Sequence, residues 1–192
     1  MRTKQPGESA LLLLDAVDVL AHGGVAYAVI GAMAASVHGM VRASIDADAV
    51  LALPISELGR LEREFRQSGF VTELRYGDTD DPIAAVLALS DGHDNRVDLL
   101  VGIQGLDPGA FARAVEVPFQ GSSLRVAALE DFIAMKLFAH GPQDVADAQF
   151  ALAVAGIAID HDLLRALAAR FGHETSAALE SLLAGAGTYK GG

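Results

Sequence analysis

Two aspartates one residue apart, Asp46 and Asp48, stand at the start of an apolar run and constrain the fold more than any other feature. Successive side chains of a strand point to opposite faces, so residues i and i+2 project from the same face. The two carboxylates would therefore lie side by side. Neighbouring carboxylates repel each other unless a cation or a proton lies between them. The pattern predicts a strand over residues 46–53 that carries a site for a divalent metal.

The residues before this pair predict a strand followed by a closely packed helix. An apolar strand is expected over residues 26–30, and Gly31 follows it directly. Residues 31–38 are small enough for a helix that packs tightly against a sheet. Backbone N–H groups at the start of such a helix favour phosphate oxygens, although close packing explains Gly31 equally well. Arg42 lies four residues before Asp46, where its guanidinium could grip a phosphate, pair with an aspartate, or do both.

Asp98 is a third carboxylate inside an apolar run, over residues 96–101. An aspartate in such a run is costly to bury without a partner. If this strand lies beside the one that carries Asp46 and Asp48, three carboxylates converge on a site that suits Mg²⁺. Metal ions held there could activate an acceptor hydroxyl and stabilise a pyrophosphate leaving group. The alternative is that Asp46 caps a turn and that Asp98 is a solvated residue at a sheet edge.

Three further polar residues have both a chemical and a structural interpretation. Lys136 stands in an apolar helix, so it either reaches water or meets a carboxylate or a phosphate. Asp144 or Asp147 could pair with it and fix the helical part of the chain on the preceding part. Ser44 lies close to the aspartate pair, but no His–Asp relay is visible that would activate it. His38 is more typical of a residue that ends a helix than of a metal ligand.

Hydrophobic periodicity predicts an α+β chain with a small mixed β-sheet and flanking helices in residues 8–127, followed by a helical region in residues 129–185. Residues 1–7 and 185–192 are expected to be loose ends. Further extended segments are expected at residues 70–74, 83–89, 96–101, 115–117 and 124–127, and helices at residues 9–21, 56–68, 107–114, 129–139, 143–155, 160–171 and 175–184.

Composition bounds the class of protein. With 192 residues, 52% of them hydrophobic, the chain can form a sizeable globular core. A net charge of −11 argues against a protein that coats nucleic acid through a broad basic face, but it allows a local basic pocket. The absence of cysteine excludes disulfides, thiolate zinc sites and a cysteine nucleophile. No segment is long enough to span a bilayer, so we expect a cytoplasmic protein with no membrane partner.

The order of these segments resembles the nucleotidyltransferase superfamily with a polymerase-β-like core, and especially AbiEii-type toxins and their stand-alone minimal relatives. The resemblance covers residues 8–155. It rests on four separate pieces that occur in the family's order, each of which is weak alone. These pieces are Ile30-Gly31-Ala32; His38-Gly39 with Arg42 and Ser44 before Asp46-Ala47-Asp48; Asp98 in Arg-Val-Asp-Leu-Leu; and Lys136 in Leu-Glu-Asp-Phe-Ile-Ala-Met-Lys-Leu, followed by Asp144-Val-Ala-Asp147.

The resemblance implies an enzyme that moves a nucleoside monophosphate from a nucleoside triphosphate to a hydroxyl of an RNA, a protein or a small molecule. It implies Asp46, Asp48 and Asp98 as catalytic residues and as ligands of Mg²⁺ or Mn²⁺. Asp98 would also lie near the acceptor hydroxyl, where it could act as a base. A toxin of this type would have an antitoxin partner. The nucleotide would contact Gly31, Ala32, Arg42, Ser44 and Lys136.

Ala32 departs from the family pattern, which usually has Gly or Ser at this position to help seat the phosphates. The change predicts weaker nucleotide binding and supports an alternative, a degenerate relative that binds a nucleotide or a protein without turnover. The presence of Asp46, Asp48 and Asp98 favours an enzyme. The acidic chain also fits poorly with a toxin that modifies tRNA, because such a toxin would need a basic surface for its substrate.

Overall fold

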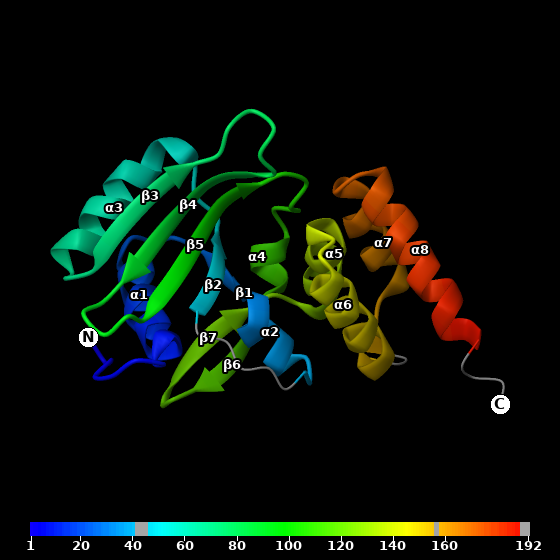
Figure 1. Cartoon of the computed structure of the whole chain (residues 1–192), viewed down its shortest axis with the longest axis horizontal. Coiled ribbons are helices and arrows are strands. Elements are labelled where there is room, and N and C mark those ends of the chain that lie inside the picture. Colours follow the sequence, from blue (N-terminus) through cyan, green and yellow to red (C-terminus); the bar gives the residue numbers. More distant parts are fainter. Residues whose placement is uncertain (41–45, 156–157, 189–192) are drawn as a thin grey trace.

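A seven-stranded mixed sheet organises the protein (Figure 1). The computed structural model describes residues 1–40, 46–155 and 158–188. The spatial order of the strands is β3-β4-β5-β2-β1-β7-β6, with β2–β5 and β1–β7 parallel and the other neighbours antiparallel. The strands are β1 (Tyr27–Ile30), β2 (Asp46–Leu51), β3 (Val71–Tyr76), β4 (Ile83–Ser90), β5 (Arg96–Ile103), β6 (Val115–Phe119) and β7 (Ser122–Val126).

Helices α1 and α3 pack on one face of the sheet, and the helices of the C-terminal third lie beside it (Figure 1). In α3, Leu58, Leu61 and Phe65 are spaced three and four residues apart, so all three face the sheet and are fully buried. No helix within the described ranges is both long and apolar enough to cross a membrane. The helices are α1 (Ser9–His22), α2 (Gly31–Val37), the 3₁₀ turn η1 (Ile55–Glu57), α3 (Leu58–Gln67), α4 (Ala110–Arg113), α5 (Leu129–Ala139), α6 (Pro142–Ala155), α7 (His161–Arg170) and α8 (His173–Thr188).

Side chains alternate between the two faces of the sheet along β2 and β5, so each face has its own set of residues. Every second residue of these strands enters the core on the side of α1, so the residues between them point to the opposite face. That opposite face contains a smaller apolar cluster against α4, which includes Ala28, Val50 and Ala114. The core side chains on the α1 side are Ala47, Ala49 and Leu51 from β2 and Val97, Leu99 and Val101 from β5.

The α+β class and the mixed sheet are confirmed, and the differences lie at the ends of segments. The prediction of a loose N-terminus was wrong, because Nη1 of Arg2 lies 2.7 Å from Asp15 Oδ1 and 2.8 Å from Asp18 Oδ2. The fully buried Asn95 also donates from Nδ2 to the Gln5 carbonyl oxygen at 3.0 Å. At the other end, α8 extends four residues past the predicted end of that helix, to Thr188. The division at residue 128 stays a prediction.

Candidate active site

Asp48 and Asp98 lie side by side at the middle of the sheet. In the parallel pair β2–β5 they are direct register partners, and the strand alternation points both side chains away from α1. Asp46 is two residues earlier on the same face, where it is exposed. The structure therefore brings the three predicted carboxylates onto one face of two adjacent strands.

The ionisation of Asp48 shows that these carboxylates interact. Burial, followed by the negative charges of Asp98 and Asp46, raises the pKa of Asp48 to about 6. The positive charges of Lys136 and Arg96 act in the opposite direction but do not offset the effect. A carboxylate whose ionisation is opposed by burial and by neighbouring carboxylates is a favourable environment for a bound metal ion.

Arg96 belongs to this site although the sequence interpretation did not single it out. Its Nε lies 2.9 Å from Oδ1 of Asp98, and its register partner on β2 is Asp46. The i, i+2 rule that identified Asp46 and Asp48 would also have placed Arg96 beside Asp98. The guanidinium holds one oxygen of Asp98 through a charge-assisted hydrogen bond.

Gly31 lies against the carboxylate of Asp48. Ile30, the last residue of β1, is the register partner of Asp48, and Gly31 follows with a φ of +64°. A Cβ atom at Gly31 would overlap Oδ2 of Asp48, so a side chain here would displace that carboxylate. Close packing is thus one role of Gly31. The prediction that Gly31 also contacts phosphate stays open, and α2, which starts here, has only seven residues.

Lys136 is held by two carboxylates on the next helix. Its Nζ lies 2.6 Å from Asp144 Oδ1 and 3.1 Å from Asp147 Oδ2, and it stands 5.8 Å from the centre of the Phe132 ring. The predicted carboxylate partners are therefore present. They lie on α6, so these bonds tie α5 to α6 and do not fix the helical region on the sheet. Its predicted contact with nucleotide phosphates is untested.

The remaining predicted residues are distributed around this centre. Ala32 lines a small pocket of about 130 Å³ that also reaches Asp46. Arg42 and Ser44 lie outside the described residues. His38 is structural, as expected, because its Nε2 lies 2.9 Å from the Ala127 carbonyl oxygen and burial lowers the pKa of its ring.

A larger cleft of about 460 Å³ opens on the carboxylate face. Asp48 and Asp98 form one end, and the cleft extends over β5 and β4 towards Arg75 and Tyr76 at the end of β3. Asp81, on the β3–β4 connection, also lines the cleft. A molecule bound in this cleft would contact both carboxylates, and the volume lies within the range of small-molecule sites.

The donor set fits Mg²⁺ or Mn²⁺. No group of three or more Asp, Glu, Cys or His side chains within the described ranges forms a preformed metal cage. Mg²⁺ does not require one, because it commonly binds through one or two carboxylates together with waters and substrate phosphates. The adjacent carboxylates of Asp48 and Asp98, with Asp46 close by, meet that requirement.

Comparisons with known proteins identify the fold. No protein-family model matches the chain, and no curated protein matches it. The crystal structure of ANT(2″)-Ia in complex with adenylyl-2″-tobramycin superimposes with a TM-score of 0.58 at 15% identity, over 84% of this chain and 95% of that one. The solution structure of the antibiotic-resistance factor ANT(2″)-Ia gives a TM-score of 0.57 at 16% identity, over 94% and 95% of the two chains.

A third neighbour is an antigenic nucleotidyltransferase-like protein from Paracoccidioides brasiliensis, with a TM-score of 0.54 at 12% identity over 95% of this chain and 90% of that one. These identities are low, so the likeness concerns the fold. The narrower resemblance to AbiEii-type proteins stays a prediction. This chain has the nucleotidyltransferase fold, and Asp46, Asp48 and Asp98 lie on two adjacent strands of its sheet.

Proposed function

We propose that this protein is a divalent-metal-dependent nucleotidyltransferase that moves a nucleoside monophosphate from a nucleoside triphosphate to a hydroxyl of a small molecule. The observation that carries the proposal is the pairing of Asp48 with Asp98 on parallel strands, with Gly31 packed against Asp48. In a chain with the nucleotidyltransferase fold, this is a site where a triphosphate and an acceptor can meet.

The proposed reaction is a displacement at the α-phosphorus of the triphosphate. The acceptor oxygen forms a bond to this phosphorus, the bond to the pyrophosphate oxygen breaks, and pyrophosphate leaves. Arg96 binds one oxygen of Asp98, and the lone pairs of the other oxygen allow it to ligate a metal ion and to take the proton of the acceptor hydroxyl. A metal ion held by Asp46, Asp48 and Asp98 would neutralise charge on the phosphates and on the leaving group.

A small-molecule acceptor is favoured over RNA or protein. The cleft beside Asp98 has a volume of about 460 Å³, which lies within the range of small-molecule sites. The net charge of −11 would oppose the approach of RNA. The neighbour ANT(2″)-Ia was crystallised with adenylyl-2″-tobramycin, a small molecule that bears an adenylyl group. That complex is consistent with a small-molecule acceptor.

Label transfer tests the proposal. The protein is incubated with each α-³²P-labelled nucleoside triphosphate, Mg²⁺ and three acceptor sets, namely hydroxyl-bearing small molecules, a short RNA and a protein extract. We expect transfer to the first set. The transfer rate should fall more than about 100-fold in Asp48→Asn and in Asp98→Asn, because mutation of even the outer-shell partners of a metal lowers activity by about 10–100-fold. Glu73→Gln is the matched control, because Glu73 is an exposed carboxylate on the edge strand β3.

The same assay separates the alternatives. Binding of metal and nucleotide without transfer to any acceptor would support a degenerate, binding-only relative, for which Ala32 is the specific sequence feature. Transfer to RNA or protein would replace the small-molecule acceptor and would support a toxin with an antitoxin partner. Equal activity of Asp48→Asn and Glu73→Gln would contradict the assignment of the site.

A further inference from the structure

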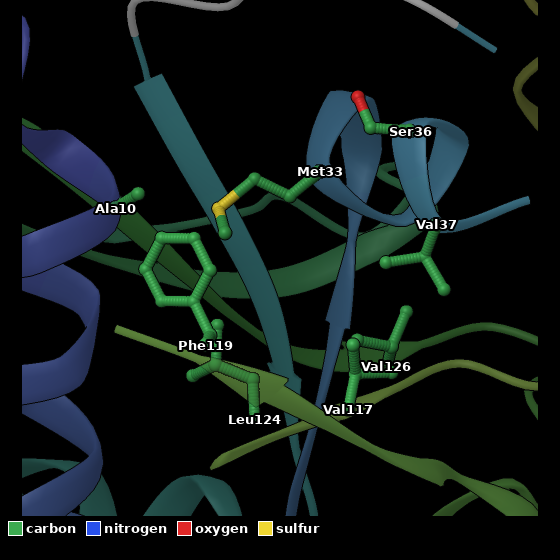
Figure 2. Close-up of a pocket in the computed structure, with 8 residues that line it drawn as sticks. All are labelled: Ala10, Met33, Ser36, Val37, Val117, Phe119, Leu124 and Val126. Carbon is green, nitrogen blue, oxygen red and sulfur yellow. The ribbon is translucent and has the colours of Figure 1, made fainter. Parts of the chain in front are cut away.

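Two cavities of the protein differ in chemistry and lie on opposite faces of the sheet. The apolar pocket of about 350 Å³ lies between α2 and the β6–β7 hairpin on the α1 side, and Figure 2 shows Met33 extending towards the Phe119 ring. No charged side chain lines that pocket. The cleft on the carboxylate face is different, because Asp48 and Asp98 line one end and Arg75 lines the other. A charged acceptor would therefore find its partners in the cleft.

Arg75 stands on the same face of the sheet as the carboxylates. It is the register partner of Val86 on β4, Val86 is the register partner of Leu100 on β5, and Leu100 is two residues after Asp98. Residues i and i+2 of a strand share a face, and so do register partners. Val86 and Leu100 thus form an apolar floor between Arg75 and Asp98. Two strand spacings, about 10 Å, separate the backbone of Arg75 from β5.

The guanidinium of Arg75 is available to a ligand. Its ion-pair partner is Glu73, whose Oε1 lies 3.8 Å from Nε, beyond hydrogen-bond distance, and the Arg75 side chain is 51% exposed. Across the ranges that the structure describes, this guanidinium donates no hydrogen bond. Those of Arg96 and Arg113, in contrast, bind carboxylates at 2.9 Å or less. A planar fork of donors in the wall of a cleft matches a carboxylate or a phosphate group.

Opposite charges at the two ends of the cleft would orient an acceptor. Asp48 and Asp98 repel an anionic group and Arg75 attracts it, so such a group binds away from the reacting centre. Asp81 also lines the cleft and would oppose an anion, but it is exposed, and solvent weakens the effect of an exposed charge. The partner of Arg75 is Glu73 and not Asp81. Direct hydrogen bonds from Arg75 therefore outweigh the repulsion by Asp81.

We propose that the acceptor carries an anionic group, a carboxylate or a phosphate, which Arg75 binds while the acceptor hydroxyl lies at Asp98. The inference rests on the proposed function and names the class of its acceptor. The reacting hydroxyl and the anionic group lie towards opposite ends of the acceptor, and its middle packs on Val86 and Leu100. Neutral and cationic small molecules are poor acceptors.

Acceptor pools of known charge test the proposal. Small molecules of a cell extract are freed of nucleotides on charcoal, separated by ion exchange into anionic, neutral and cationic pools, and offered to the full chain with Mg²⁺ and α-³²P-labelled triphosphates. We expect transfer to the anionic pool. Treatment of that pool with a phosphatase, which is then removed, abolishes transfer if the anionic group is a phosphate and leaves it unchanged if the group is a carboxylate.

Transfer to the neutral or cationic pool in preference to the anionic pool would overturn the proposal. Transfer to none of the three pools, together with a failure to bind a triphosphate, would instead count against the proposed function.

Variants of the cleft give the test a sign. With an acceptor purified from the anionic pool, Arg75→Ala should raise the acceptor KM at least about tenfold and leave kcat and the triphosphate KM unchanged. Arg75→Lys should restore part of the loss, because it keeps the charge without the fork. Asp81→Asn should lower the acceptor KM about twofold. Arg63→Ala is the control, since Arg63 is an exposed arginine on α3, outside the cleft.

The opposite signs would overturn the proposal, because a lower acceptor KM in Arg75→Ala and a higher one in Asp81→Asn indicate a cationic acceptor. A rise of the triphosphate KM in Arg75→Ala would overturn it as well, since Arg75 would then bind the nucleotide. Equal effects of Arg75→Ala and Arg63→Ala would show that only net charge matters. Arg75→Ala should keep the Tm of the wild type, which separates its effect from misfolding.

Discussion

Asp48 connects the fold to the chemistry at the scale of single residues. Its pKa of about 6 in the folded protein lies above the value of about 3.9 for an unfolded chain. As pH rises from about 4 to 6, the unfolded chain loses this proton first. The free energy of unfolding of the metal-free protein therefore falls over that interval. The contribution of Asp48 to it stays unfavourable at neutral pH. The folded state tolerates a charged Asp48 poorly unless a cation is bound.

Asp48→Asn should stabilise the metal-free protein at neutral pH. The amide keeps the shape of the carboxyl group but does not ionise, so the variant avoids the cost of a charged group beside Asp98 and Asp46. In EDTA at pH 8 we expect its free energy of unfolding to exceed that of the wild type by about 1–3 kcal/mol. At about pH 3, below the pKa of Asp48 in both states, the difference should nearly vanish. Urea denaturation at both pH values measures it, and a variant less stable at pH 8 would mean that Asp48 is structural.

Gly31→Ala should damage the site more than the fold. A Cβ at Gly31 would overlap the Asp48 carboxylate, whereas one at Gly24, which has the same φ of +64°, would meet no atom within 4 Å. Backbone strain should cost each alanine variant about 1 kcal/mol, by thermal or urea unfolding. Only Gly31→Ala should also lose nucleotide transfer. If Gly24→Ala loses as much activity, the contact between Gly31 and Asp48 does not matter for function.

Much of the site could be predicted from the sequence because its key relation is local. The i, i+2 spacing of Asp46 and Asp48 fixes their common face without any tertiary information. The pairing with Asp98 is different, since it depends on β5 lying parallel to β2, which spacing alone does not specify. The chain order of the family resemblance supplied that step. Arg96 was not predicted, although the same i, i+2 spacing places it on the face of Asp98.

At the scale of elements, α5 joins the helical region to the rest of the molecule. Arg113 on α4 forms two hydrogen bonds to Asp131 on α5, at 2.8 and 2.7 Å, and a third to Asp107 at 2.8 Å. Asp131 is only 2% exposed, and this guanidinium supplies the cation that lies against it. The helix over residues 129–139 was predicted correctly from its apolar periodicity, but this bond was not, because the two residues are 18 positions apart and on different elements.

Arg113→Ala should destabilise the protein by about 3–5 kcal/mol, because it leaves the carboxylate of Asp131 buried without its cation. Arg165→Ala is the matched control. It removes an exposed pair with Glu180, whose side chains are 49% and 56% exposed, and should cost less than about 1 kcal/mol. Denaturant unfolding compares the two. Similar losses in both variants would show that the bond between α4 and α5 contributes no more than a surface ion pair.

At the scale of the whole molecule, charge and site geometry favour the same kind of substrate. The chain carries 25 acidic and 14 basic residues, so a polyanion is repelled unless a metal ion screens it. Under the proposed function, a metal-bound nucleoside triphosphate would meet this condition at Asp48 and Asp98, and a long RNA would not. The composition argues only against a broad basic face for nucleic acid, while the cleft beside Asp48 and Asp98 became visible only when β3, β4 and β5 were assembled side by side.

A crystal structure with Mg²⁺ and a non-hydrolysable nucleoside triphosphate tests the central claim most directly. We predict a metal ion about 2.0–2.1 Å from carboxylate oxygens of both Asp48 and Asp98, with triphosphate oxygens completing its coordination. A triphosphate bound elsewhere, or a metal ion that contacts neither of these two residues, would contradict the account.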